Sequence, residues 1–167
     1  MVAVFSISAC NNDDVTRDQT SLPPDIIATN AFYYYADVDA AWAFYRDTFG
    51  LETVVDYGFA KILRLADSSY LTLVQADSGM HSIDEPKTVT LNLVTDTLEP
   101  WAQHLAASGV NMHTSYSSDH EQQSNSFVAV DPEGYLLRFV RYNPHPSHDN
   151  FVDAFSASDP VASLAGK

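Results

Sequence analysis

The chain has 167 residues, enough for one compact domain with a sizeable apolar interior. Eight Lys and Arg against 22 Asp and Glu give a formal net charge of −14, which argues against a nucleic-acid partner because phosphate binding needs a basic face. No apolar run approaches the roughly 20 residues that a membrane-spanning helix needs.

The N-terminal segment, residues 1–26, predicts export rather than folded structure. Cys10 is the only cysteine, so no internal disulfide can form. Ile7-Ser8-Ala9-Cys10 follows a short apolar run and resembles the lipobox of bacterial lipoproteins, and a polar stretch follows it. This resemblance predicts that Cys10 is lipidated and holds the protein on the periplasmic side of a bacterial cell envelope. The apolar run is shorter than an export signal and has no Lys or Arg, so a free cysteine in a cytoplasmic protein is the alternative.

The folded part is predicted to open with a strand over residues 28–36. Alternation puts Asn30, Phe32 and Tyr34 on one face and Ala31, Tyr33 and Tyr35 on the other, and both faces carry bulk. A helix follows, with Asp37 as its N-cap, a stripe at Trp42, Tyr45 and Phe49, and Gly50 at its end. The stripe indicates a helix packed on one face.

Three strands and a linker complete the first half. The strands are predicted over residues 53–57, 60–65 and 70–75, because turn signals separate the apolar runs there. The segment 77–87 contains a glycine and a proline and is predicted to connect the two halves.

The second half repeats this order. A strand over residues 88–95 precedes a helix that is capped by Asp96 or Thr97, packs through Leu98, Trp101, Ala102 and Leu105, and ends at Gly109. Further strands are predicted over 111–116, 127–130 and 135–142, with a polar stretch over 117–126 and a turn over 131–134. The tail, 143–167, is predicted to dock a short helix through Phe151, Val152 and Phe155.

A shift of 59 residues relates the two halves. It carries Asp37 onto Asp96, Trp42 onto Trp101 and Gly50 onto Gly109, in a chain with only two Trp and six Gly. Such self-similarity indicates two copies of one supersecondary unit, with modules at about 27–77 and 88–142.

This pattern resembles the vicinal oxygen chelate superfamily, which includes glyoxalase I, the bleomycin and fosfomycin resistance proteins and the extradiol dioxygenases. The resemblance rests on Asp37, on Phe44-Tyr45, on Phe49-Gly50-Leu51 and on Asp131-Pro132-Glu133-Gly134, and it covers residues 27–142. It implies an α+β fold of two βαβββ modules that form an open, curled β-barrel around a cleft. It also implies that two copies can pair as a homodimer.

The resemblance also implies where catalytic relatives hold their metal. The four positions carry Asn30, Thr72, Val89 and Arg138 here, and none is the His, Glu or Asp that a divalent cation requires. Their sequence neighbours offer no ligand either. We therefore expect no metal site and no cofactor.

A cleft without a metal would hold a small molecule. Phe32 and Tyr34 would supply apolar area, Asn30, Thr72 and Val89 would line the same wall, and His113 would flank it. An inward Arg138 needs a partner, which is either an acidic ligand or a neighbouring Asp or Glu of the chain.

The sequence thus predicts a metal-free small-molecule-binding protein with an unidentified ligand. The first alternative is a metal-dependent lyase or dioxygenase with displaced ligands among His81, His113 and His120. A second is a lipid-tethered interaction module with an unused pocket.

Overall fold

The computed structural model describes residues 26–118 and 122–156. Its elements alternate in two similar series, and a short helix follows the second. The first series is β1 (Thr29–Tyr35), α1 (Val38–Phe49), β2 (Thr53–Asp56), β3 (Ala60–Ala66), β4 (Ser69–Gln75) and the short 3₁₀ helix η1 (Ala76–Ser78). The second is β5 (Thr90–Val94), α2 (Leu98–Ala107), β6 (Asn111–Thr114), β7 (Ser124–Val130) and β8 (Leu136–Tyr142), with α3 (Asp149–Ser156) after it.

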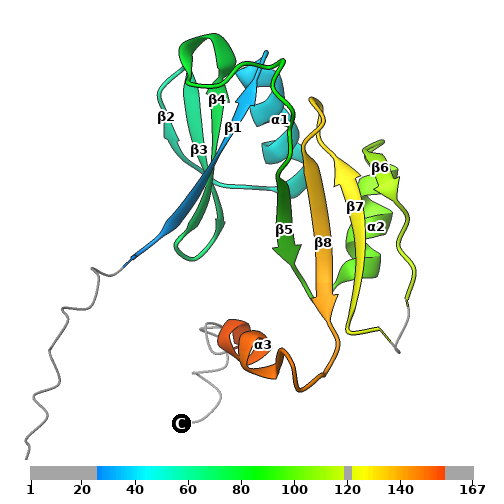
Figure 1. Ribbon diagram of the computed structural model, residues 1–167. Helices are drawn as coiled ribbons and strands as arrows, with labels where there is room; N and C mark the ends of the chain where they lie inside the picture. Colours follow the sequence, from blue (N-terminus) through cyan, green and yellow to red (C-terminus); the bar gives the residue numbers. More distant parts are fainter. Residues whose placement is uncertain (1–25, 119–121, 157–167) are drawn as a thin grey trace, which may run out of the picture.

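The strands form two four-stranded mixed sheets. The first sheet has the order β1-β4-β3-β2 and the second has the order β5-β8-β7-β6, as Figure 1 shows. β1 is parallel to β4 and β5 is parallel to β8, and all other neighbouring strands are antiparallel. The predicted α+β architecture of two curled, unclosed sheets is confirmed.

The helix ends follow the residues that the sequence singled out. The Asp37 carboxylate accepts a hydrogen bond from the Ala40 N–H at 2.9 Å, and Gly50 closes α1 with a φ of 66°. In the second series the N-cap is Thr97, without a side-chain capping bond, and Gly109 has a φ of 72°. The N-caps lie 60 residues apart but the glycines 59, so the stretch from N-cap to glycine is one residue shorter in the second half, where Ser108 is the C-cap and Gly109 follows it.

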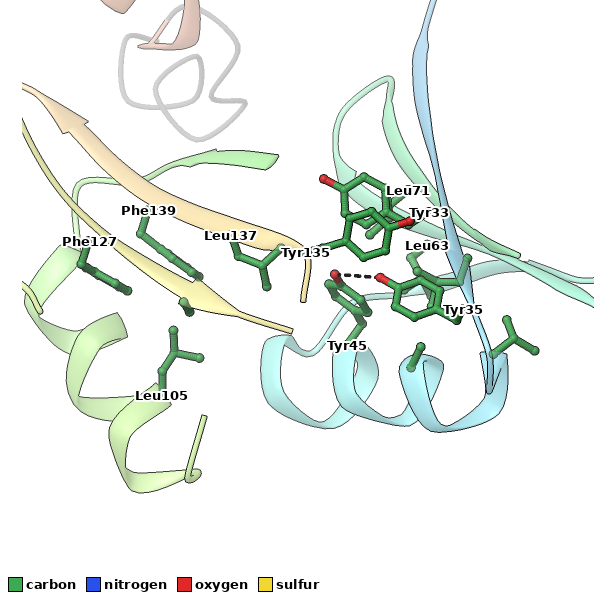
Figure 2. Packing of buried hydrophobic residues seen from close by; sticks show 14 of the residues in the cluster. Tyr33, Tyr35, Tyr45, Leu63, Leu71, Leu105, Phe127, Tyr135, Leu137 and Phe139 are labelled. Carbon is green, nitrogen blue, oxygen red and sulfur yellow. Dashed lines mark hydrogen bonds between the residues drawn. The ribbon is translucent and has the colours of Figure 1, made fainter. Parts of the chain in front are cut away.

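Both helices lie on the same side of the sheets and share one core (Figures 1 and 2). Tyr45 of α1 and Leu105 of α2 are buried in it, together with alternate residues of β1, β4, β7 and β8. The two tryptophans pack against this core and are half-buried. Trp42 also donates its indole N–H to Thr53 and lies beneath the Arg46 guanidinium.

The turn between β7 and β8 joins the two halves. The Asp131 carboxylate accepts hydrogen bonds from the Tyr35 hydroxyl at 2.6 Å and the Tyr45 hydroxyl at 3.1 Å. The Tyr135 hydroxyl accepts from the Tyr34 N–H at 2.9 Å, and its ring stacks on that of Tyr33 at 3.9 Å. We call the group formed by Tyr33, Tyr35, Tyr45, Tyr135 and Asp131 the tyrosine seam. Figure 2 shows its four tyrosine rings between the two sheets.

The C-terminal helix makes a partial contact with the second sheet. The Phe151 ring meets Tyr142 edge-on at 5.4 Å, yet Phe151 stays 49% exposed. The predicted lipidation site Cys10 lies outside the described residues, and so does His120. No helix in the part that the structure describes is both long and apolar enough to cross a membrane.

Candidate functional site

The candidate site lies on the faces of the two sheets that turn away from the helices, which we call the inner faces. Strand pairing shows which residues share them. On the first sheet they are Asn30, Phe32 and Tyr34 of β1, Tyr70, Thr72 and Val74 of β4, and Ala60, Ile62 and Arg64 of β3. On the second they are Thr90, Asn92 and Val94 of β5, Leu136, Arg138 and Val140 of β8, and Ser126, Val128 and Val130 of β7.

The centre of the first inner face is largely apolar. Phe32 is 55% exposed there and lies beside Thr72, which is opposite Ile62. The Thr72 hydroxyl donates a hydrogen bond to the Asn30 side-chain oxygen at 3.0 Å. The predicted wall residues Asn30, Phe32 and Thr72 are therefore together, and the two polar ones satisfy each other.

Tyr34 shares this face but is covered. Its ring is only 7% exposed because the linker crosses it: a Cβ at Gly79 would lie 2.5 Å from the ring, and His81 meets the ring edge-on. The His81 ring is held in turn by a 2.7 Å contact to Glu85. Tyr34 thus closes one end of the inner face and offers a ligand little surface, which sequence alternation could not show.

The centre of the second inner face is polar. Arg138 is half-buried in mid-strand, with Asn92 beside it on β5 and Val128 beside it on β7. Among the described residues, neither Arg138 nor Asn92 makes a side-chain hydrogen bond or ion pair. The internal salt bridge that was one alternative for Arg138 is therefore absent from this part of the chain.

Two predicted wall residues lie away from these centres. Val89 precedes β5, and the alternation of that strand puts Thr90, rather than Val89, on the inner face with Asn92. The prediction carried the helix spacing of 59 residues into the strand, where the spacing is 60. His113 lies exposed on β6, the edge strand, with β7 between it and β8.

Asn92 is an inner-face residue that the site prediction omitted. The sequence contained the pattern that points to it, because Thr90 and Asn92 are the polar residues of a strand in which polar and apolar residues alternate. The offset of 59 residues selected Val89 instead.

The described histidines do not gather into a metal site. His81 lies on the linker beside β1 and His113 on the far edge of the other sheet, while His104 contacts the Thr48 carbonyl. Within residues 26–118 and 122–156 no group of three His, Cys, Asp or Glu side chains could hold a metal ion.

The tyrosine seam holds the phenols whose pKa values burial raises. Burial and the nearby Asp131 raise the pKa of Tyr33 to about 12. Burial is also the first cause of the raised pKa values of Tyr35, Tyr45 and Tyr135. These phenols stay protonated at neutral pH, so they are not general bases.

Two surface hollows lie on other parts of the molecule. One, of about 460 Å³, lies between the end of α1 and the start of α2 and is lined by Asp47, Thr48, Phe49, Gly50, Thr97, Pro100, Trp101 and His104. The other lies under α3 and is lined by Tyr142, Asn143, Pro144, Asp149, Val152 and Asp153. Neither includes an inner-face centre.

Several solved structures have the same fold as this chain. The chain is similar to lactoylglutathione lyase from Agrobacterium tumefaciens, with a TM-score of 0.57 and 24% identity over 71% of this chain and 95% of that chain. A glyoxalase/bleomycin resistance protein/dioxygenase from Nocardioides gives a TM-score of 0.63 and 15% identity, with 76% and 91% covered. TioX from Micromonospora sp. ML1 gives 0.56 and 15%, with 69% and 98% covered. At such identities these likenesses show the fold alone.

The family itself is shown by the sequence. No curated protein matches the chain. The model of the Glyoxalase/Bleomycin resistance protein/Dioxygenase superfamily matches residues 27–139, which is more than half of the chain. The chain therefore belongs to the Glyoxalase/Bleomycin resistance protein/Dioxygenase superfamily.

Proposed function

We propose that this protein binds a small organic molecule against its inner faces and does so without a metal ion. The observation that carries the proposal is the composition of the two inner-face centres. They hold Phe32, Thr72 and Ile62 in one sheet and Asn92, Arg138 and Val128 in the other. Phe32 and Ile62 supply apolar area, Asn92 a neutral hydrogen-bonding group and Arg138 a cation, which is the usual make-up of a small-molecule site.

Ligand chemistry supports the metal-free part. Divalent cations are held by imidazole, thiolate or carboxylate groups, and a guanidinium at the centre of a face repels them. The imidazole of His81 contacts Glu85 and meets the ring of Tyr34 edge-on at one end of the first sheet.

Metal analysis of the purified protein tests this part directly. We expect substoichiometric Ni, Zn, Mn and Fe, and melting temperatures that change neither on adding these ions nor on adding chelator, because a bound ion would stabilise the folded state by mass action. A tightly held ion at stoichiometric occupancy, with a melting temperature that chelator lowers, would refute the proposal. It would favour the metal-dependent enzyme.

A melting-temperature screen of aromatic, cationic and carboxylate compounds tests the binding part. Compounds that bind should lose affinity in Phe32→Ala and keep it in Phe59→Ala. Phe59 is a matched control because it is 53% exposed, close to the 55% of Phe32, but lies next to the β2–β3 turn. Equal loss in both variants would place the ligand elsewhere.

A further inference from the structure

The inner face of the second sheet carries a cation with which no described residue forms an ion pair. Arg138 is half-buried at the centre of β8, yet no described acid lies within ion-pairing distance of it. The described arginines of the first half are paired, Arg46 with Asp47 at 2.6 Å and Arg64 with Glu52 at 2.9 Å, whereas Arg138 and Arg141 of β8 make no ion pair with a described residue. In a chain with 22 acidic residues, leaving such a guanidinium open has a desolvation cost that a neighbouring Asp or Glu would remove.

Asn92, on the neighbouring strand β5, also lacks a described side-chain partner. It is the direct cross-strand partner of Arg138, it is exposed, and it too makes no side-chain hydrogen bond to a described residue. The corresponding pair of the first sheet is Phe32 and Thr72, and there the Thr72 hydroxyl is bonded to Asn30. The first sheet closes its central polar groups internally, whereas the second leaves a guanidinium and an amide side by side.

The surroundings of this pair are aliphatic. Val128 lies across from Arg138 on β7, and the next inner-face pair along the strands is Val94 with Val140. Val94 is 45% exposed and so offers apolar surface next to the two polar groups. A molecule that fills this area needs an anionic end and an apolar body.

We propose that Arg138 and Asn92 form the anchor for the carboxylate of an organic acid whose apolar body rests on the accessible side chains of Val94 and Val128. This inference rests on the proposed binding function and names its ligand class. The planar guanidinium donates two parallel hydrogen bonds to a carboxylate, and the adjacent amide adds a third donor.

Charge favours a carboxylate over a phosphate. The net charge of −14 repels anions, and a dianion pays about twice the penalty of a monoanion. One guanidinium offsets one charge. Screening by physiological salt acts over about 8 Å, so the local attraction of Arg138 outweighs the distant acids for a bound monoanion.

The test uses matched probes: a set of aromatic and alkyl carboxylic acids, the neutral primary amide of each, and inorganic phosphate. Binding is measured by isothermal titration on the full chain. We expect acids to bind at least about tenfold more tightly than their amides, because a hydrogen bond to a charged group is worth about 1.5–3 kcal/mol. Phosphate alone should not compete.

Three variants locate the anchor. Arg138→Met keeps the aliphatic stem and should reduce the affinity for acids about 10- to 100-fold, to the level of the amides. Asn92→Asp supplies the missing internal carboxylate and should abolish acid binding although Arg138 is still present. Arg141→Met is the control, because Arg141 lies on the same strand three residues on and on the opposite face.

Melting temperatures of the ligand-free variants show whether Arg138 serves to bind a ligand or to stabilise the fold. Since no described group pairs with Arg138, Arg138→Met should not lower the melting temperature of the ligand-free protein, and Asn92→Asp should raise it. A lower melting temperature in both variants would overturn the proposal.

The remaining outcomes each decide a question. Acids and amides that bind equally, or acids that bind equally to Arg138→Met, would refute the carboxylate anchor while leaving the binding function intact. Phosphate binding without acid binding would assign the site to inorganic anions instead. Absence of any binding, with cationic and neutral compounds included, would refute both proposals.

Discussion

The Tyr33 hydroxyl offers the sharpest test of the core. It is buried, and no described group accepts or donates a hydrogen bond to it, although its ring stacks on Tyr135 at 3.9 Å. Replacing Tyr33 with Phe keeps the ring and removes the unpaired hydroxyl. Because an unsatisfied buried polar group costs about 1–3 kcal/mol, we expect Tyr33→Phe to raise the free energy of unfolding by about 1 kcal/mol.

The matched control is Tyr35, the next tyrosine of β1 whose side chain faces the helices and the core. Tyr35 is equally buried, but its hydroxyl donates to the Asp131 carboxylate at 2.6 Å and lies 3.2 Å from the Tyr45 hydroxyl. Tyr35→Phe removes the same atom and breaks the bond to the charged Asp131, so it should lower the free energy of unfolding by about 1.5–3 kcal/mol. The two substitutions are chemically identical and should have opposite signs.

Urea unfolding followed by circular dichroism measures both effects. The dependence of the free energy on urea should stay the same in all three proteins, since neither substitution changes the surface exposed on unfolding, and only the midpoint should move. If Tyr33→Phe destabilises the protein as much as Tyr35→Phe does, the Tyr33 hydroxyl has a partner and the reasoning is wrong.

Three further predictions concern the seam, the linker and the N-terminus. Burial raises the pKa of Tyr33 to about 12, against about 10 when unfolded, so unfolding releases its proton above pH 10; the free energy of unfolding should therefore fall between pH 10 and pH 12, and urea unfolding should show a shallower fall in Tyr33→Phe. Gly79→Ala should push the linker off Tyr34, cost about 1–3 kcal/mol and speed proteolysis of the linker; unchanged proteolysis would contradict the close contact. Cys10→Ser should release the protein from bacterial membranes on fractionation, and retention would refute lipidation of Cys10.

Local chemistry explains what the sequence could predict. Asp37 and Gly50 bound the first helix because a carboxylate caps free N–H groups and glycine adopts a left-handed conformation without strain. Strand alternation likewise placed Asn30 and Phe32 on one face. These features depend on neighbouring residues only.

Contacts across the fold could not be predicted in this way. Which acid pairs with Arg138 depends on the position of every carboxylate in space, and the absence of a described partner emerges only from the structure. The cover over Tyr34 depends on the path of a linker some 45 residues further along the chain. Val89 was misplaced because a repeat spacing taken from helix residues was one residue short in the strand.

The Asp131 carboxylate belongs to the second half of the chain, yet two of its hydrogen-bond donors, Tyr35 and Tyr45, belong to the first. If one half unfolded alone, the buried tyrosine hydroxyls or the buried carboxylate of the other half would lose their hydrogen-bond partners. Calorimetry should therefore record a single endotherm whose van't Hoff and calorimetric enthalpies agree, even though the architecture consists of two similar halves.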